Sequence, residues 1–319
     1  MKHLSKILFL ALLCMACRDE HDVPTHDFTI GFKAGVENTR AVVTGIEPLK
    51  DGFSVWGGFD GTTVFDGRKV YWGTDSEGNT GWMYDNPEVW VLNKNYTFFA
   101  VYPLQNQDKV VPFIEGNALA YKLSFEVPST ADTDLLTASN SVNTNDTPPA
   151  TVALNFTHTL TRVNINIQKN GANAENEVIV RAISINNLKK SGIYNNHTNQ
   201  WEETVDGMNF TTLNDLNVEL GLDNTGKPTP TSVIKDLLLI PQQIAENSIQ
   251  ISITYSLQTD NTIDYYTVNA YLPSTEWQKQ TIYTYNISLG EQNNSILFGI
   301  PSVQDWKREE QIGGSIIIQ

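Results

Sequence analysis

Apolar and polar residues alternate along most of this chain, which is the pattern of β-strands with one buried face. The alternation is clear near the start, at Phe28, Ile30 and Phe32. An aromatic run at 96–102 has the composition of a further strand. The same alternation returns in four later segments, at 152–156, 163–167, 249–255 and 283–289. We therefore expect strands from Phe28 to the end of the chain.

Turn residues separate these segments. Asp66-Gly67 stands between the apolar runs 64–65 and 70–72 and predicts a hairpin turn there. Only residues 131–140 have a helical pattern, and it is short. Closely spaced strands with almost no helix predict an all-β fold built of β-sandwiches. The polar, proline-containing loop at 139–150 is the expected boundary between two such units.

The first residues have the order of a secretory signal. Basic residues come first, residues 7–13 form an unbroken apolar run, and small Ala16 precedes Cys17. A spanning helix needs about 20 apolar residues, so an uncleaved anchor helix is disfavoured. We expect a bacterial lipoprotein signal at 1–17 with lipid on Cys17, followed by a solvated tether. A secreted protein without lipid stays open as the alternative, because Cys14 stands where the signal usually has Leu.

Composition excludes several kinds of chemical site and one class of partner. The chain's two cysteines, Cys14 and Cys17, both lie in the signal, so the folded part has no disulfide, thiolate metal site or cysteine nucleophile. The formal net charge of −15 repels phosphate backbones, and we expect no nucleic-acid partner.

Catalytic motifs are not found in the sequence. His158 and His197 are the two histidines beyond the tether, and neither has a metal ligand at suitable spacing on its own segment. We interpret His158 as a structural histidine. The sequence has no nucleophile elbow, dinucleotide turn or phosphate loop. We expect no catalysis, no cofactor and no metal; a hydrolase with an unrecognised carboxylate pair is a third, weaker alternative.

An aromatic cluster between 56 and 90 has two interpretations. Trp82 and Tyr84 lie in the Gly/Asp/Asn-rich stretch 74–87, and exposed on one flat face they would suit the binding of a glycan. The alternative, which we favour, is that these rings fill a sandwich core, where aromatic side chains dominate burial.

Six motifs together resemble the fimbrillin family, the subunits and accessory proteins of the donor-strand pili of Bacteroides-type bacteria. They are spread over nearly the whole chain after the tether. Each motif is weak alone, but all six occur in the family's order. The motifs lie at 96–103, 134–138, 152–163, 239–242, 277–287 and 303–306.

The resemblance implies two transthyretin-like β-sandwich domains and a lipoprotein precursor at the outer membrane. In that family a protease cuts after a basic residue in an early loop and frees the first strand, and a strand from another subunit fills the groove. The matching positions are Arg40 for the cut and Phe28, Ile30 and Phe32 for the removable strand.

The end of the chain carries a candidate donor strand at Ile316, Ile317 and Ile318. The alternative is an ordinary last strand of the second domain. We therefore divide the chain into the signal at 1–17, a tether and removable strand at 18–40, and sandwiches at 41–147 and 148–319.

These observations predict a surface-exposed structural or adhesive pilus subunit of the outer membrane, found in the fimbrium if it is processed. Expected partners are other pilus subunits in a homo- or hetero-polymer, the membrane through the lipid, and a ligand on a host or bacterial surface. The alternative function is a glycan-binding outer-membrane lipoprotein that does not polymerise.

Overall fold

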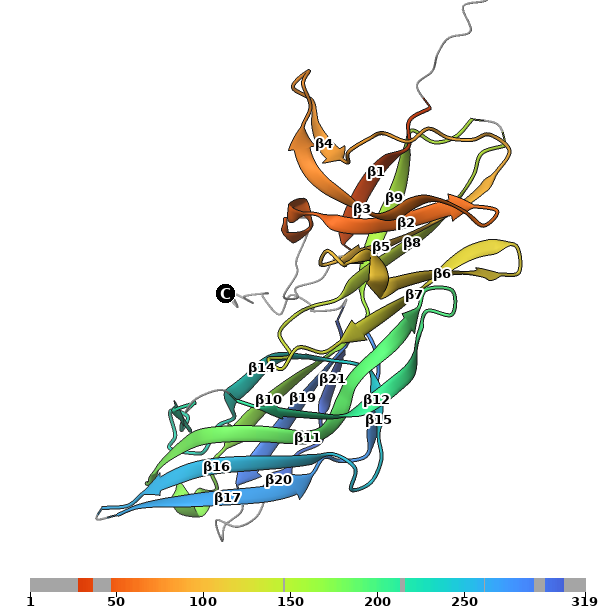
Figure 1. Cartoon of the computed structure of the whole chain (residues 1–319). Helices are drawn as coiled ribbons and strands as arrows, with labels where there is room; N and C mark the ends of the chain where they lie inside the picture. Colours follow the sequence, from red (N-terminus) through yellow and green to blue (C-terminus); the bar gives the residue numbers. More distant parts are fainter. Residues whose placement is uncertain are drawn as a thin grey trace, which may run out of the picture.

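The computed structural model describes residues 28–36, 47–145, 147–212, 216–260, 262–289 and 296–306. Strands make up nearly all of the regular structure, with three short 3₁₀ turns (Figure 1). The turns are η1 (Pro48–Asp51), η2 (Gln107–Lys109) and η3 (Gly171–Asn173). The predicted all-β fold is confirmed, and so are strands at each of the segments where the alternation is clear.

The first sheet has seven strands in the order β1-β9-β8-β5-β2-β3-β4 and forms the upper part of the molecule in Figure 1. It curls so that its two ends, β1 and β4, touch. The buried side chains of its inner face form one continuous core. The bounds are β1 (Gly31–Val36), β2 (Phe53–Phe59), β3 (Thr62–Thr74), β4 (Thr80–Met83), β5 (Asn95–Tyr102), β8 (Leu136–Asn143) and β9 (Thr151–His158).

Two local predictions in this region are wrong. Residues 131–140 contain no helix: after an irregular stretch, β8 pairs with β5 along its full length, and burial on a sheet outweighs the weak helical pattern. Asp66-Gly67 is not a hairpin turn either. Gly67 takes a positive φ of 65° inside β3, and the chain reverses earlier, at Asp60 and Gly61.

The sheet pairing also departs from the predicted boundary between 147 and 148. Strand β9 lies after that boundary but pairs with β8 and β1 of the first sheet. Conversely, β6 and β7 lie before it but extend the sheet of β11. The polar loop marks a chain reversal between β8 and β9, because polar loops occur within a sheet as well as between domains.

Three further sheets make up the rest of the molecule; most of their strands form the lower part, whereas β6 and β7 lie beside the first sheet (Figure 1). One contains the path β17-β16-β11-β7-β6 with β12 and β13 on β11, one contains β14-β10-β19-β20 with β21 on β19, and β15 pairs with β18. The bounds are β6 (Val110–Glu115), β7 (Ala118–Glu126), β10 (Thr161–Gln168), β11 (Glu177–Asn195), β12 (Gln200–Thr211), β13 (Val218–Glu219), β14 (Thr231–Leu239), β15 (Gln242–Ile244), β16 (Gln250–Gln258), β17 (Ile263–Tyr271), β18 (Thr275–Trp277), β19 (Thr281–Leu289), β20 (Ile296–Phe298) and β21 (Ser302–Asp305).

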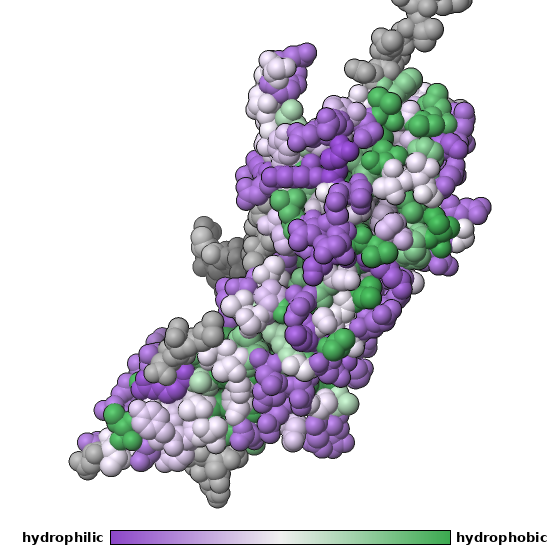
Figure 2. Space-filling model, in the orientation of Figure 1, coloured by the Kyte–Doolittle hydropathy of each residue, from purple (hydrophilic) through white to green (hydrophobic). Residues whose placement is uncertain are grey.

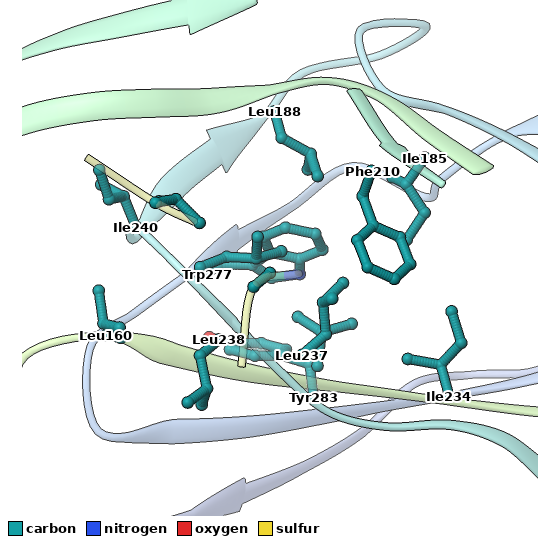
Figure 3. Close-up of a cluster of buried hydrophobic side chains, with 14 of the residues drawn as sticks. Leu160, Ile185, Leu188, Phe210, Ile234, Leu237, Leu238, Ile240, Trp277 and Tyr283 are labelled. Atoms are coloured by element: carbon teal, nitrogen blue, oxygen red, sulfur yellow. The ribbon is translucent and has the colours of Figure 1, made fainter. Parts of the chain in front are cut away.

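A second hydrophobic core lies between these sheets and also includes Trp56, Phe99 and Val101 of the first sheet. Trp277 sits in its middle, surrounded by aliphatic side chains from several strands (Figure 3). Its indole Nε1 donates a hydrogen bond to the Tyr285 hydroxyl at 3.0 Å, so the one polar atom of the ring is satisfied. Burial on this scale supplies the stability that a chain without disulfides requires.

Candidate functional site

Strand β1 lies at the edge of the first sheet. It runs parallel to β9, with Gly31 opposite Thr151 and Val36 opposite Phe156. Gly31 is required at the start of this pairing, because a Cβ there would lie 2.6 Å from the carbonyl oxygen of Ala150. The close approach of β1 to the chain at Ala150 therefore needs a glycine at position 31. The alternation of apolar residues does not predict this role for Gly31.

The residues just before β1 have a second neighbour, the segment 88–90. The backbone N–H of Ile30 donates to the carbonyl of Glu88 at 2.8 Å, and the N–H of Trp90 donates to the carbonyl of Phe28 at 2.8 Å. Thr29 and Val89 form an antiparallel bridge between these bonds. The N-terminal segment is thus held by backbone hydrogen bonds on both sides, to 88–90 first and then to β9.

The residues that this segment buries differ in part from those predicted. Ile30 and Phe32 are buried as expected, and Ala34 continues the alternation into β1. Phe28, in contrast, is 39% exposed. It precedes the first residue that pairs with β9 and lies outside the core cluster, which begins at Ile30. The apolar set that the strand buries is therefore Ile30, Phe32 and Ala34.

Phe32 inserts into a group of aromatic rings. Its ring centroid lies 5.3 Å from that of Phe65, 5.6 Å from Tyr84 and 5.9 Å from Phe98, each in an edge-to-face arrangement. Such pairs stabilise a core beyond the area that they bury. Phe32 is therefore the main side-chain anchor of β1.

Tyr84 and Trp82 belong to the same core. The Tyr84 hydroxyl donates to the carbonyl of Ile30 at 2.7 Å and accepts from the N–H of Glu88 at 3.0 Å, so it ties the two backbones together. Burial raises the pKa of this hydroxyl above its usual value. Trp82 packs against Phe53 at 5.2 Å and against Trp72 at 5.3 Å. Both rings are half-buried, and this packing favours their structural interpretation over a flat ligand-binding face.

The His158 side chain contacts a buried carboxyl group. Its Nδ1 lies 2.8 Å from a carboxylate oxygen of Asp134, and both side chains are almost fully buried. The ring stacks on Trp306 with 4.0 Å between centroids and 11° between planes. These contacts give His158 a packing role. Within the described ranges, no group of three or more His, Cys, Asp or Glu residues is arranged to hold a metal ion.

Several predicted residues lie outside the described residues: Cys17, Arg40 and Ile316 to Ile318. Across the part of the chain that the structure describes, there is no helix of the length and apolarity needed to cross a membrane.

Comparisons with known proteins find a matching family model and solved structures with a similar fold. A family model described as fimbrillin-like matches residues 39–306. A fimbrial protein from Bacteroides vulgatus has a similar structure, with a TM-score of 0.64 and 20% identity, covering 87% of this chain and 99% of that one. A candidate cell adhesion protein from Bacteroides ovatus gives a TM-score of 0.52 and 14% identity, covering 88% and 99%. No curated protein matches the sequence. Because the family model spans most of the chain, this protein belongs to the fimbrillin-like family.

Proposed function

We propose that this protein is a surface-exposed structural or adhesive pilus subunit that assembles by strand exchange after cleavage near Arg40. It is made as a lipoprotein anchored to the outer membrane through Cys17, and it acts without catalysis. The observation that carries the proposal is the double attachment of β1 and its preceding residues to β9 and to 88–90.

Loss of this segment would open a groove. Backbone groups along both of its edges would then have no hydrogen-bond partner. The carbonyls of Ala150 and Glu88 would lose their donors, and the rings around Phe32 would face water. Burying a side chain such as Ile30 or Phe32 is worth roughly 1.5–3 kcal/mol. An incoming strand that restores both the ladder and the burial would therefore bind tightly.

The position of Arg40 fits this scheme. It falls in the connection between Val36, the last residue of β1, and Pro48, the first residue of η1. A cut after Arg40 would separate β1 covalently from all other described strands. The same cut would release the remaining chain from a lipid on Cys17.

The incoming strand must present apolar side chains at alternate positions, because Ile30, Phe32 and Ala34 are spaced by two. Ile316 and Ile318 have this spacing at the end of the chain. We propose this end as the donor to the next subunit. The description of the B. vulgatus neighbour as a fimbrial protein supports a role in such a polymer.

Limited trypsin digestion of the chain from Arg18 onward tests the proposal. We expect a product that starts at Ala41 by intact mass and that forms oligomers on gel filtration. Arg40→Ala should block both changes, whereas Lys109→Ala, a basic residue beside another loop, should block neither. A product that starts at Ala41 and stays monomeric with itself and with partner subunits would refute strand exchange.

Mass spectrometry of the N-terminus from the native membrane tests the anchor. An acylated Cys17 at the start of the precursor, with Ala41 at the start of polymeric material, is the expected result. An unmodified N-terminus in the precursor contradicts the lipoprotein assignment.

A further inference from the structure

Strand β17 is a nine-residue edge strand with no obvious protection. It pairs with β16 on one side, in a regular antiparallel register from Ile263 opposite Gln258 to Tyr271 opposite Gln250. No strand among the described residues pairs with its other side. Figure 1 shows β17 as the outermost strand at the lower end of the molecule. A long, regular edge of this kind is a template for pairing with another chain.

Several other edges of the fold have protective features that β17 does not have. Pro112 lies within β6, where it removes one backbone donor, and irregular register interrupts both β14 and β12. The strands β4, β20 and β21 are at most four residues long. Prolines, bulges and short length are the usual means by which proteins block pairing at an edge. In β17 there is no proline, no basic residue and no shift of register.

Two hydrogen bonds show which backbone groups face outward. The N–H of Thr259 donates to the carbonyl of Thr262, and the N–H of Leu272 donates to the carbonyl of Ile249. In an antiparallel ladder, hydrogen-bonded residues recur every second position. The even-numbered residues of β17 therefore bond to β16, and the odd-numbered residues direct their N–H and C=O groups away from the sheet.

The side chains of the odd-numbered residues are exposed too. Ile263 is 53% exposed, Tyr265 is 68% exposed and Tyr271 is 46% exposed, whereas Val268 between them is buried. The outward backbone groups and the large exposed side chains thus belong to the same five residues. The full set is Ile263, Tyr265, Thr267, Asn269 and Tyr271.

We infer that β17 pairs with β17 of a second copy of this chain, antiparallel, about a two-fold axis at Thr267. In this register Thr267 faces its own counterpart, Tyr265 faces Asn269, and Ile263 faces Tyr271. Every outward N–H and C=O of the five odd-numbered residues then finds a partner. The apolar Ile263 side chain meets the Tyr271 ring, and cross-strand pairs of this kind stabilise a sheet.

The position of the one carboxylate in β17 favours the antiparallel orientation over an in-register parallel one. Asp264 is the one carboxylate in β17, and no basic residue accompanies it. The two-fold register places Asp264 opposite Ala270. A parallel pairing would place the two Asp264 carboxylates side by side, which is unfavourable. The interaction is self-complementary, as a two-fold interface requires.

This association lies on the second core, away from β1, and does not depend on cleavage at Arg40. Single edge-to-edge contacts are small and weak. Repeated along a filament or on a membrane surface, they would add up through multivalency. Lateral association of subunits is therefore a separate property from end-to-end assembly.

Sedimentation of the uncleaved chain from Arg18 onward provides the first test. We expect a monomer–dimer equilibrium at concentrations on the order of 100 µM. Thr267→Lys places two lysines opposite each other at the axis and should weaken dimerisation about fivefold or more. Thr254→Lys is the matched control: it breaks the same 3.0 Å contact between the Thr254 and Thr267 hydroxyls and adds the same charge, but one strand away from the edge.

Single cysteines provide a second test that fixes the register. The chain after Cys17 has no cysteine, so Thr267→Cys introduces the one thiol. Directly opposed, hydrogen-bonded residues lie about 5.5 Å apart between Cα atoms, which suits a disulfide. Thr267→Cys should form a disulfide dimer under mild oxidation, and Asn269→Cys should not. A purely monomeric chain, equal cross-linking at both positions, or equal effects of Thr267→Lys and Thr254→Lys would overturn the inference.

Discussion

Phe32 is predicted to be buried by the sequence pattern, and it contributes to the stability of the N-terminal sheet. The alternation of apolar residues identifies Ile30 and Phe32 correctly, because both point into the core. It wrongly predicts that Phe28 is buried. Period-two alternation shows which residues share a face of a strand, but not at which residue that face begins to be covered by the core. Ala34 was missed because a small side chain carries a weak apolar signal.

Phe32→Ala should destabilise the N-terminal sheet by about 3–5 kcal/mol, because it leaves a cavity among three aromatic rings. Phe28→Ala is the matched control and should cost less than about 1 kcal/mol at its exposed position. Denaturant unfolding followed by tryptophan fluorescence measures both. Equal costs at the two positions would contradict the burial described above.

Buried tyrosines make the stability of the folded protein fall at alkaline pH. Burial raises the pKa of Tyr255 to about 12, and that of Tyr285 to about 12 as well. An unfolded tyrosine titrates near pH 10. Because the folded pKa is the higher one, this contribution is complete below about pH 10 and is lost as the pH rises toward 12.

The melting temperature should therefore fall between about pH 10 and pH 12. Tyr255→Phe should make that fall shallower, since it removes one group whose ionisation favours the unfolded chain. An equally steep fall in Tyr255→Phe would contradict this assignment. Calorimetric scans across this pH range decide between the two results.

At the scale of the element, β1 is held as much by its neighbours as by its own sequence. Tyr84 bonds to the carbonyl of Ile30 and to the N–H of Glu88, so one hydroxyl joins both sides of the segment. Tyr84→Phe should weaken this attachment by about 1 kcal/mol while keeping the ring in the core. Hydrogen exchange at Ile30 and Trp90 should accelerate by roughly fivefold, with little change in β16.

Tyr71→Phe serves as the control, because the Tyr71 hydroxyl contacts Asp85 at the surface and does not touch β1. If both variants exchange alike, Tyr84 does not secure β1.

Strands with long alternation, such as β9, β10 and β19, could be predicted from the sequence because each buries one complete face. The failures have a common physical cause. The helical pattern before β8 and the Asp66-Gly67 turn are local signals, and long-range pairing overrides them. The partner of a strand is also absent from its own pattern, so the sequence alone does not show that β9 pairs with β8 and β1. The same limit hid the role of 88–90 in holding β1.

At the scale of the whole molecule, Trp306 is one of several contacts at the junction between the upper and lower parts. This residue follows β21 in the lower part, yet its fully buried ring stacks on His158 at the end of β9 in the upper part. The face drawn in Figure 2 is mostly hydrophilic, with hydrophobic patches gathered over the upper part. Trp306 therefore joins the end of the described chain to the first sheet.

Trp306→Ala should destabilise the protein by about 3–5 kcal/mol and loosen the junction. Limited proteolysis should then cut between the two parts before either core unfolds. Val303→Ala, on β21 but 57% exposed, should stay within about 0.5 kcal/mol of the parent protein and keep its cleavage pattern. A loss of stability without new cleavage would give Trp306 a purely local role.

The route of the chain through this junction has a mechanical consequence. β9, which flanks β1, continues into β10 through only two residues, and β10 pairs in parallel with β19 from Arg162 to Gln168. A pull transmitted through a strand in the β1 position would run along the axes of these strands. The ladder bonds lie across the strands, so tension would load them together in shear instead of opening them one by one. The fold thereby resists stretching along the direction in which its strands run.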